Sequence, residues 1–203
     1  MRVPSNLSNP VRVAPQQERS TRRLAGFLEA AAELFASAGY EATTMTAIAE
    51  RSGSSIGALY NYFPDKQSLA FTLVNQYASE LEELWKPVIE QAATVPHTEF
   101  ANLFIETITG FVQKRPAYLS LISAPVKFRR EPAARKASRL MIAKSFRAKN
   151  PSLSEDRALL AAYMAFQIVK GMMALYTEAP SGTRDAVVNE SKKLLTMYLG
   201  SFL

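Results

Sequence analysis

The segment TAIAERSGSSIGALYNYF, residues 46–63, restricts the fold of this chain more than any other feature of its sequence. It joins two short apolar patches through a turn rich in glycine and serine, and neither patch is long enough to form a stable helix alone. Ala49 is small where two helices would cross, and Gly53 can adopt a positive φ in the turn. Ile48, Leu59 and Tyr62 then share an inner face. This spacing predicts a helix-turn-helix that a preceding helix supports. In such a motif the second of the two short helices enters the DNA major groove.

The outer side of that last helix suits contact with DNA. Small residues at its start let the free N–H groups of the helix N-terminus approach a phosphate. Donors for phosphates and base edges follow along the chain. The small residues and donors together are Ser54, Ser55, Gly57, Tyr60, Asn61, Tyr62 and Lys66. A structural alternative stays open at this point, because Gly–Ser turns also join short helices in proteins that bind no DNA.

The rest of the chain shows helical periodicity and no sustained strand pattern, so we expect an all-α protein. Apolar residues recur at three- and four-residue spacing in the predicted helices 19–39, 43–52, 55–62, 65–93, 98–114, 116–123, 132–149, 153–178 and 183–202. The expected domains are a flexible N-terminal arm (1–18), a helix-turn-helix domain (19–66) and a larger helical domain (67–203).

Composition excludes several classes of protein. The chain has 203 residues, of which 48% are apolar, so it can bury a substantial core. It has no cysteine, which excludes disulfides and thiolate metal sites and fits a reducing cytoplasm. No apolar run reaches the length of a membrane span, and the N-terminus lacks the apolar region of a secretory signal. We therefore expect a cytoplasmic protein with no membrane partner.

Positive charge gathers outside the predicted helix-turn-helix. The formal net charge is +6, yet residues 114–149 hold eleven lysines and arginines against one acid, Glu131, a net charge of +10. Three interpretations stay open: the solvated face of helix 132–149, a field that draws the protein toward DNA, or an entrance that favours an anionic ligand such as a carboxylate.

A resemblance to a known family narrows the function. The block GYEATTMTAIAERSGSSIGALYNYFPDKQSL, residues 39–69, and the preceding AAAELFASA, residues 30–38, closely resemble the N-terminal domain of the tetracycline-repressor (TetR) family. The similarity covers residues 19–71, about a quarter of the chain. It implies an all-helical regulator with a DNA-binding head and a ligand-binding, dimerising body.

The resemblance also implies roles by position. Thr44 and Lys66 match phosphate contacts at the starts of two helices, while Leu59 and Phe63 belong to the core. The recognition-helix positions are Ser55, Gly57, Tyr60, Asn61 and Tyr62. Two residues depart from the family pattern. Ser54 stands where the family usually has an apolar residue, and Ile56 stands where it often has a polar or basic one. Isoleucine cannot donate a hydrogen bond, but it can contact a thymine methyl. Arg23, near the start of the first helix, is a further candidate for phosphate contact.

The larger domain is expected to dimerise and to bind a small molecule. The resemblance implies a homodimer through helices 153–178 and 183–202, and the first of these is apolar on nearly all sides, as a helix buried on every face would be. A two-fold dimer requires a palindromic operator. Candidates for a ligand pocket are Trp85, Phe104, Phe111, Tyr118, Met141, Tyr163, Phe166 and Gln167; each is equally a plausible core residue. Gln167 stands out as an amide among apolar neighbours.

The sequence shows no pattern of catalytic residues. The single histidine, His97, lies beside Pro96 in an expected loop, and no nucleophile–base pair, metal-binding cluster or cofactor motif is found. We expect a ligand-responsive transcriptional repressor that binds a palindromic operator as a dimer and is released by a small-molecule inducer. The alternatives are a transcriptional activator of the same fold, and a ligand-binding or interaction module whose helix-turn-helix is vestigial.

Overall fold

The computed structural model describes residues 13–126 and 132–203, with side chains for 17–126 and 136–203. These residues form α-helices, one short 3-10 helix and no strand, which confirms the all-α prediction. The helices are α1 (Val13–Ala42), α2 (Met45–Arg51), α3 (Ile56–Tyr60), α4 (Lys66–Gln91), α5 (His97–Lys114), α6 (Ala117–Ile122), α7 (Pro132–Lys149), α8 (Glu155–Glu178), η2 (Ser181–Thr183) and α9 (Arg184–Gly200).

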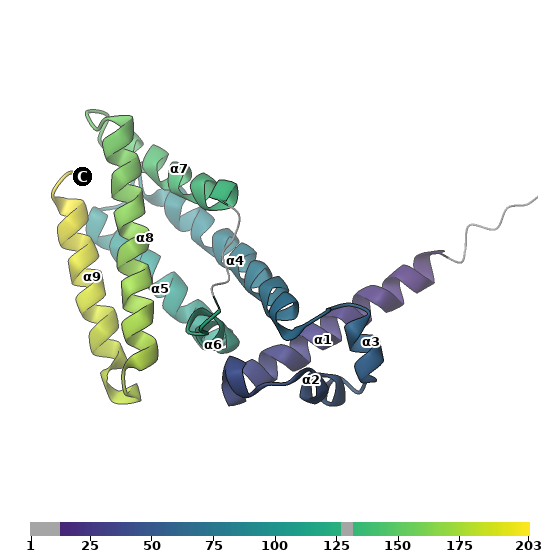
Figure 1. The fold of residues 1–203 in the computed structure, drawn as a ribbon. Coiled ribbons are helices and arrows are strands. Elements are labelled where there is room, and N and C mark those ends of the chain that lie inside the picture. Colours follow the sequence, from purple (N-terminus) through teal and green to yellow (C-terminus); the bar gives the residue numbers. More distant parts are fainter. Residues whose placement is uncertain (1–12, 127–131) are drawn as a thin grey trace, which may run out of the picture.

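The first three helices form a small head with its own core. α2 packs against α1, and α3 packs against α2, on the side of α1 that faces away from the rest of the molecule (Figure 1). Phe27 and Phe35 of α1, Ile48 of α2 and Leu59 beside them are completely buried. α2 and α3 are therefore held by α1, as two helices of this length require.

The remaining helices form a bundle. α5 packs against α4 and α9, while α8 packs against α7 and α9 (Figure 1). Apolar residues on the facing sides of these helices build its core, among them Phe100, Phe104, Phe146 and Leu195. Side-chain caps define where two of the helices begin: Asp65 and Ser68 form a capping box at α4, and Ser154 Oγ accepts from the Arg157 N–H at α8.

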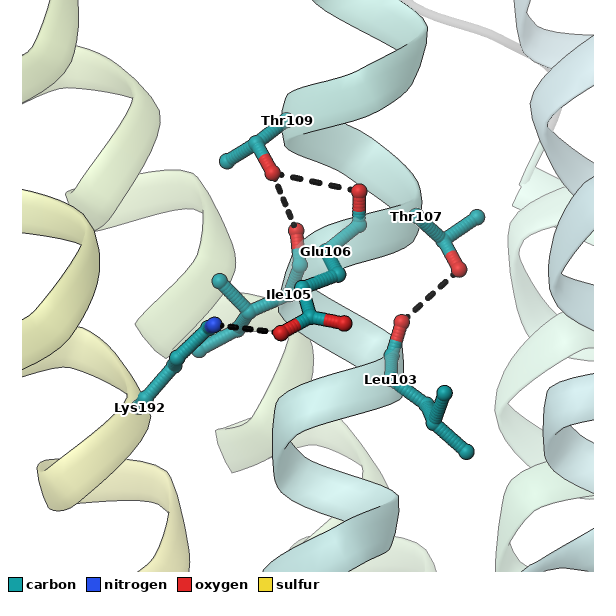
Figure 2. A network of polar contacts seen from close by, with 6 residues as sticks. All are labelled: Leu103, Ile105, Glu106, Thr107, Thr109 and Lys192. Atoms are coloured by element: carbon teal, nitrogen blue, oxygen red, sulfur yellow. Dashed lines mark hydrogen bonds and ion pairs between the residues drawn. The ribbon is translucent and has the colours of Figure 1, made fainter. Parts of the chain in front are cut away.

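Polar contacts reinforce the bundle at its surface. Figure 2 shows Lys192 of α9 donating to a Glu106 carboxylate oxygen of α5 at 2.6 Å. On the same helix, Thr107 and Thr109 donate to carbonyls one turn earlier, those of Leu103 and Ile105. The exposed ion pair adds a small tether between two helices that are held mainly by apolar packing.

Two connections link the head to the bundle. α4 leaves the head and runs into the bundle as one continuous helix, and the short α6 packs against the C-terminal half of α1 (Figure 1). Gly39, where α1 breaks with φ of 83°, lies close to Ser120 of α6. α6 and α4 therefore both contact the helix that supports α2 and α3.

Most helix bounds lie within two residues of the expected ones, and the main differences concern α1 and α3. α1 begins at Val13, so residues 13–18 of the predicted flexible arm are helical, while residues 1–12 lie outside the described residues. α3 spans only five residues, Ile56–Tyr60, because Asn61 already forms its C-cap.

The basic run of residues 114–149 is engaged largely in packing and ion pairs where the structure describes it. Arg115 pairs with Glu80 at 2.9 Å, and Arg147 pairs with Glu155 at 2.6 Å. The Lys149 ammonium donates to the Val95 carbonyl. Lys136 and Lys144 lie exposed on α7, as a solvated helix face predicts. Lys127, Arg129 and Arg130 lie outside the described residues, and the side chain of Arg135 is likewise not described.

Candidate nucleic-acid interface

The turn between α2 and α3 has the geometry that its sequence predicts. Gly53 has φ of 65°, the left-handed conformation that glycine adopts without strain. The Ser54 N–H donates to the Ala49 carbonyl at 2.9 Å, and Ala49 is buried at the crossing point. The turn is therefore tight, and it places Leu59 of α3 in the same core as Phe27 and Phe35 of α1.

α3 presents most of its predicted contact residues to solvent. Tyr60 is 51% exposed and Ile56 is 38% exposed, and both are large side chains with no place in the head core. Gly57 and Asn61 are exposed beside them. Ser55 is also exposed, and its Oγ accepts from the Ala58 N–H at 3.2 Å as the helix N-cap. Leu59, on the opposite side, is fully buried, which confirms its core assignment.

Tyr62 and Ser54 are turned partly toward the protein. The Tyr62 ring packs edge-on against Phe27 of α1, with ring centroids 5.4 Å apart. Its hydroxyl lies 3.0 Å from Ser20 Oγ, also on α1. Tyr62 follows the last residue of α3, so the chain has already turned back toward α1. Tyr62 thus supports α3 from its inner side, as the spacing predicts, and the recognition role that the resemblance implies for it stays a prediction. Ser54 is half-buried in the turn.

Two predicted phosphate contacts lie on the surface of the head. Thr44 is exposed and caps α2, its Oγ1 accepting from the Ala47 N–H at 3.1 Å. Arg23 is exposed on α1. Its neighbour Arg22 pairs with Glu18 at 3.5 Å, so Arg22 offers less net charge to a polyanion. Thr44 and Arg23 therefore remain available to a duplex.

Lys66 makes contacts within the chain that its predicted role does not include. Its ammonium donates to the carbonyls of Tyr40, Glu41 and Thr43 at 2.7, 3.1 and 2.8 Å, and it lies 4.4 Å from the centre of the Tyr40 ring. An ammonium has three N–H donors, and all three are used. Lys66 satisfies the last carbonyls of α1 and the following loop, because the break at Gly39 brings these carbonyls together.

The predicted pocket residues form two packed aromatic clusters rather than the lining of a hollow. Trp85 stacks on Phe104 with centroids 4.8 Å apart, Phe166 meets both rings edge-on, and Trp85 Nε1 donates to the Phe104 carbonyl at 2.9 Å. Phe111 and Tyr118 contact each other at 5.4 Å in a second cluster. These five candidates therefore contact one another within the core.

The other three pocket candidates lie nearer the surface. Met141 is half-buried against the core, and Tyr163 is exposed beneath the Arg139 guanidinium at 4.3 Å. Gln167 is exposed in the isolated subunit, so it does not lie in the core of the bundle. It lies on the face of α8 that points away from the bundle. The sequence does not show which face this is, because the helix is apolar on nearly all sides.

Two open hollows lie elsewhere, where the head meets the bundle. One is formed by α1, α4 and Arg115, and the other by α1, Arg51 and the junction of α5 with α6. None of the eight predicted pocket residues lines either hollow. Sequence reasoning missed their lining residues, because Tyr77 and the leucines around it follow the same periodicity as ordinary core.

Comparison with known proteins decides the family. The family model described as "Bacterial regulatory proteins, tetR family" matches residues 27–73. A second, "Tetracyclin repressor-like, C-terminal domain", matches residues 96–199, about half of the chain. This chain belongs to the TetR family. Regulators of this family bind DNA and small-molecule effectors and form dimers.

Relatives of this TetR-family regulator include named repressors. The transcriptional repressor KstR of Rhodococcus jostii is 27% identical over 191 residues, which cover 91% of this chain and 84% of that protein. AcnR of Corynebacterium glutamicum, also a transcriptional repressor, is 33% identical over 67 residues, 33% of this chain and 36% of that protein.

Solved structures share the fold. A TetR-family regulator from Streptomyces coelicolor matches with a TM-score of 0.65 and 18% identity over 89% of this chain and 99% of that one. FadR from Bacillus subtilis, in complex with stearoyl-CoA, matches with a TM-score of 0.64 and 16% identity over 88% and 99%. The order and packing of the helices in this chain are thus those of TetR-family regulators.

Proposed function

We propose that this TetR-family regulator is a cytoplasmic repressor without catalytic activity, which binds a palindromic operator as a homodimer and releases it when a small molecule binds. One observation carries the proposal: α3 is a supported helix whose outer side, with Tyr60, Ile56, Gly57 and Asn61, is exposed and covered by no other described part of the chain. The names of the relatives KstR and AcnR support repression over activation.

The contacts at the operator follow from the chemistry of this surface. Tyr60 and Asn61 offer hydroxyl and amide groups to base edges and phosphates, and Ile56 offers apolar contact to a thymine methyl. Thr44 and Arg23 flank α3 on the head surface and contact the backbone. Two such heads bind half-sites separated by one turn of DNA, about 34–36 Å.

Dimerisation uses the outer faces of α8 and α9. One exposed face of α8 carries residues at spacings of three to four. They are Leu160, Met164, Gln167, Gly171 and Leu175. On α9, Leu194 and Met197 are 55% and 75% exposed. An apolar surface that spans two neighbouring helices marks a protein interface, and a two-fold axis lets it pair with itself.

The same surface explains the high hydropathy of α8. Within the part of the chain that the structure describes, α8 alone is long and apolar enough to cross a membrane, with a hydropathy of 1.6. One such helix is weak evidence for a membrane span, since a core helix of a soluble protein passes the same test. α8 packs against α7 and α9, and its remaining apolar face suits the partner subunit.

A binding titration tests the function directly. Fluorescence anisotropy on the DNA upstream of the protein's own gene should show specific binding whose affinity falls steeply as salt rises, because phosphate contacts release counterions. Absence of binding at every salt concentration contradicts the proposal and supports an interaction module with a vestigial helix-turn-helix.

Truncation of Tyr60 tests the role of α3. Tyr60→Ala should weaken operator affinity about tenfold to a hundredfold, the range of one good base or phosphate contact of 1–3 kcal/mol. The melting temperature and the dimer should not change, because the Tyr60 side chain has no place in the head core. Anisotropy titration and thermal unfolding measure both quantities.

The neighbouring tyrosine provides the matched control. Tyr62→Phe retains the ring that packs on Phe27 and removes only the hydroxyl near Ser20, so operator affinity should change less than about threefold. A larger loss of affinity in Tyr62→Phe than in Tyr60→Ala would show that the chain after α3, and not its exposed side, reads the operator.

A further inference from the structure

The two hollows at the junction of head and bundle share three residues, Ala32, Tyr77 and Arg115, and therefore adjoin each other. Their volumes are about 320 and 540 Å³, within the range of small-molecule sites. The walls of the first are mainly apolar, with Leu24 and Leu28 of α1 facing Leu73 of α4. Such walls suit a hydrocarbon chain.

The side chain of Tyr77 lies where the two hollows meet. Tyr77 is only 3% exposed, and its ring packs edge-on against Phe111 and Tyr118. Its hydroxyl makes no hydrogen bond to any residue that the structure describes and is not enclosed by protein, so it is open to a ligand in the hollows. Burial raises the pKa of Tyr77 above that of a free tyrosine, so at neutral pH the hydroxyl is protonated and can donate.

The second hollow carries excess positive charge. Arg51, Lys114 and Arg115 line it, and the one acid among its lining residues, Glu33, is paired with Arg51 at 2.5 Å. Arg115 uses its Nε–H toward Glu80, which leaves four of its five donors for other acceptors. This end of the site favours an anionic group.

We propose that this junction binds a small amphipathic carboxylate. Its hydrocarbon chain lies between Leu24, Leu28 and Leu73, and its carboxylate accepts hydrogen bonds from Tyr77 and Arg115. This assigns the effector to a site between the head and the bundle rather than to the aromatic core of the bundle.

The position of the site couples it to the DNA-binding head. Its walls come from α1 on one side and from α4 and the start of α6 on the other, the same elements that join head and bundle. A ligand that binds more tightly to a conformation with a wider junction shifts the spacing of the two recognition helices. The ratio of its affinities for the two conformations limits how far it can lower operator affinity. This regulatory half rests on the proposed function, whereas binding itself does not.

Titration with decanoate, in the absence of DNA, tests the site. Isothermal titration calorimetry on the full chain should detect decanoate binding, and decan-1-ol, which lacks the charge, should bind at least about tenfold more weakly. Tyr77→Phe, which removes only the hydroxyl, should weaken decanoate binding about tenfold. Arg115→Gln should weaken decanoate binding more than decanol binding.

Replacement of either of two alanines on α1 by phenylalanine tests where the ligand binds. Ala25→Phe places a ring in the first hollow and should abolish decanoate binding, whereas Ala38→Phe, on an exposed position of α1 that lines neither hollow, should leave it unchanged. Equal binding by both variants overturns the proposal, as does an absence of binding up to about 1 mM decanoate. If decanoate binds as expected but no variant or wild-type protein binds operator DNA, the site stands and the proposed repressor function fails.

Discussion

Leu175→Glu is expected to convert the protein into a monomer and to reduce operator affinity by about 10²–10⁴-fold. Leu175 is 57% exposed on the apolar face of α8, so the substitution costs the isolated subunit little. In the dimer it places a carboxylate in an apolar interface, and by the two-fold symmetry it does so twice. The loss at the operator follows because two linked heads bind with a high effective concentration that a single head lacks.

Leu84→Glu provides the matched control for this substitution. Leu84 is an exposed leucine on α4, away from α8 and α9. Sedimentation equilibrium should show a dimer for Leu84→Glu and for the unmodified protein, and a monomer for Leu175→Glu. A dimer in all three proteins would place the interface elsewhere, and a Leu175→Glu monomer with full operator affinity would show that one head suffices.

Lys66→Ala is expected to destabilise the head by about 2–3 kcal/mol, the range for hydrogen bonds to a charged group. The substitution leaves the carbonyls of Tyr40, Glu41 and Thr43 without the ammonium that they share, and it removes the cation from the Tyr40 ring. Thermal unfolding followed by circular dichroism should show a melting temperature lower by roughly 5–10 °C at equal protein concentration.

Lys86→Ala separates this effect from a general loss of charge. Lys86 is exposed on the same helix, α4, and its replacement should leave the melting temperature within about 2 °C of the unmodified protein. The opposite pattern for Lys66→Ala, an unchanged melting temperature with weakened operator binding, would support this lysine as a phosphate contact.

Local sequence was sufficient to predict the helix-turn-helix. The positive φ of Gly53, the close crossing at Ala49 and the inner position of Leu59 were all predicted from spacing and residue type, and all are present. Each of these features depends on interactions within a few residues, such as caps, turn dihedrals and one apolar face. A single sequence contains that information because neighbouring residues impose it on one another.

The roles of Lys66, Tyr62 and Gln167 were decided by residues far away in the chain. Lys66 is bound by carbonyls 23 to 26 residues earlier, and Tyr62 lies near Ser20, 42 residues away. Gln167 is exposed because α7 and α9 cover other faces of α8.

The sequence by itself determined the all-α class, the family and the recognition helix. Tertiary structure alone decided which polar groups remain free for DNA, which aromatic rings fill the core, and where head and bundle leave a hollow. The physical reason is that a hydrogen-bond donor or an apolar surface is available to a partner only if no other part of the folded chain already occupies it, and this depends on contacts between distant segments.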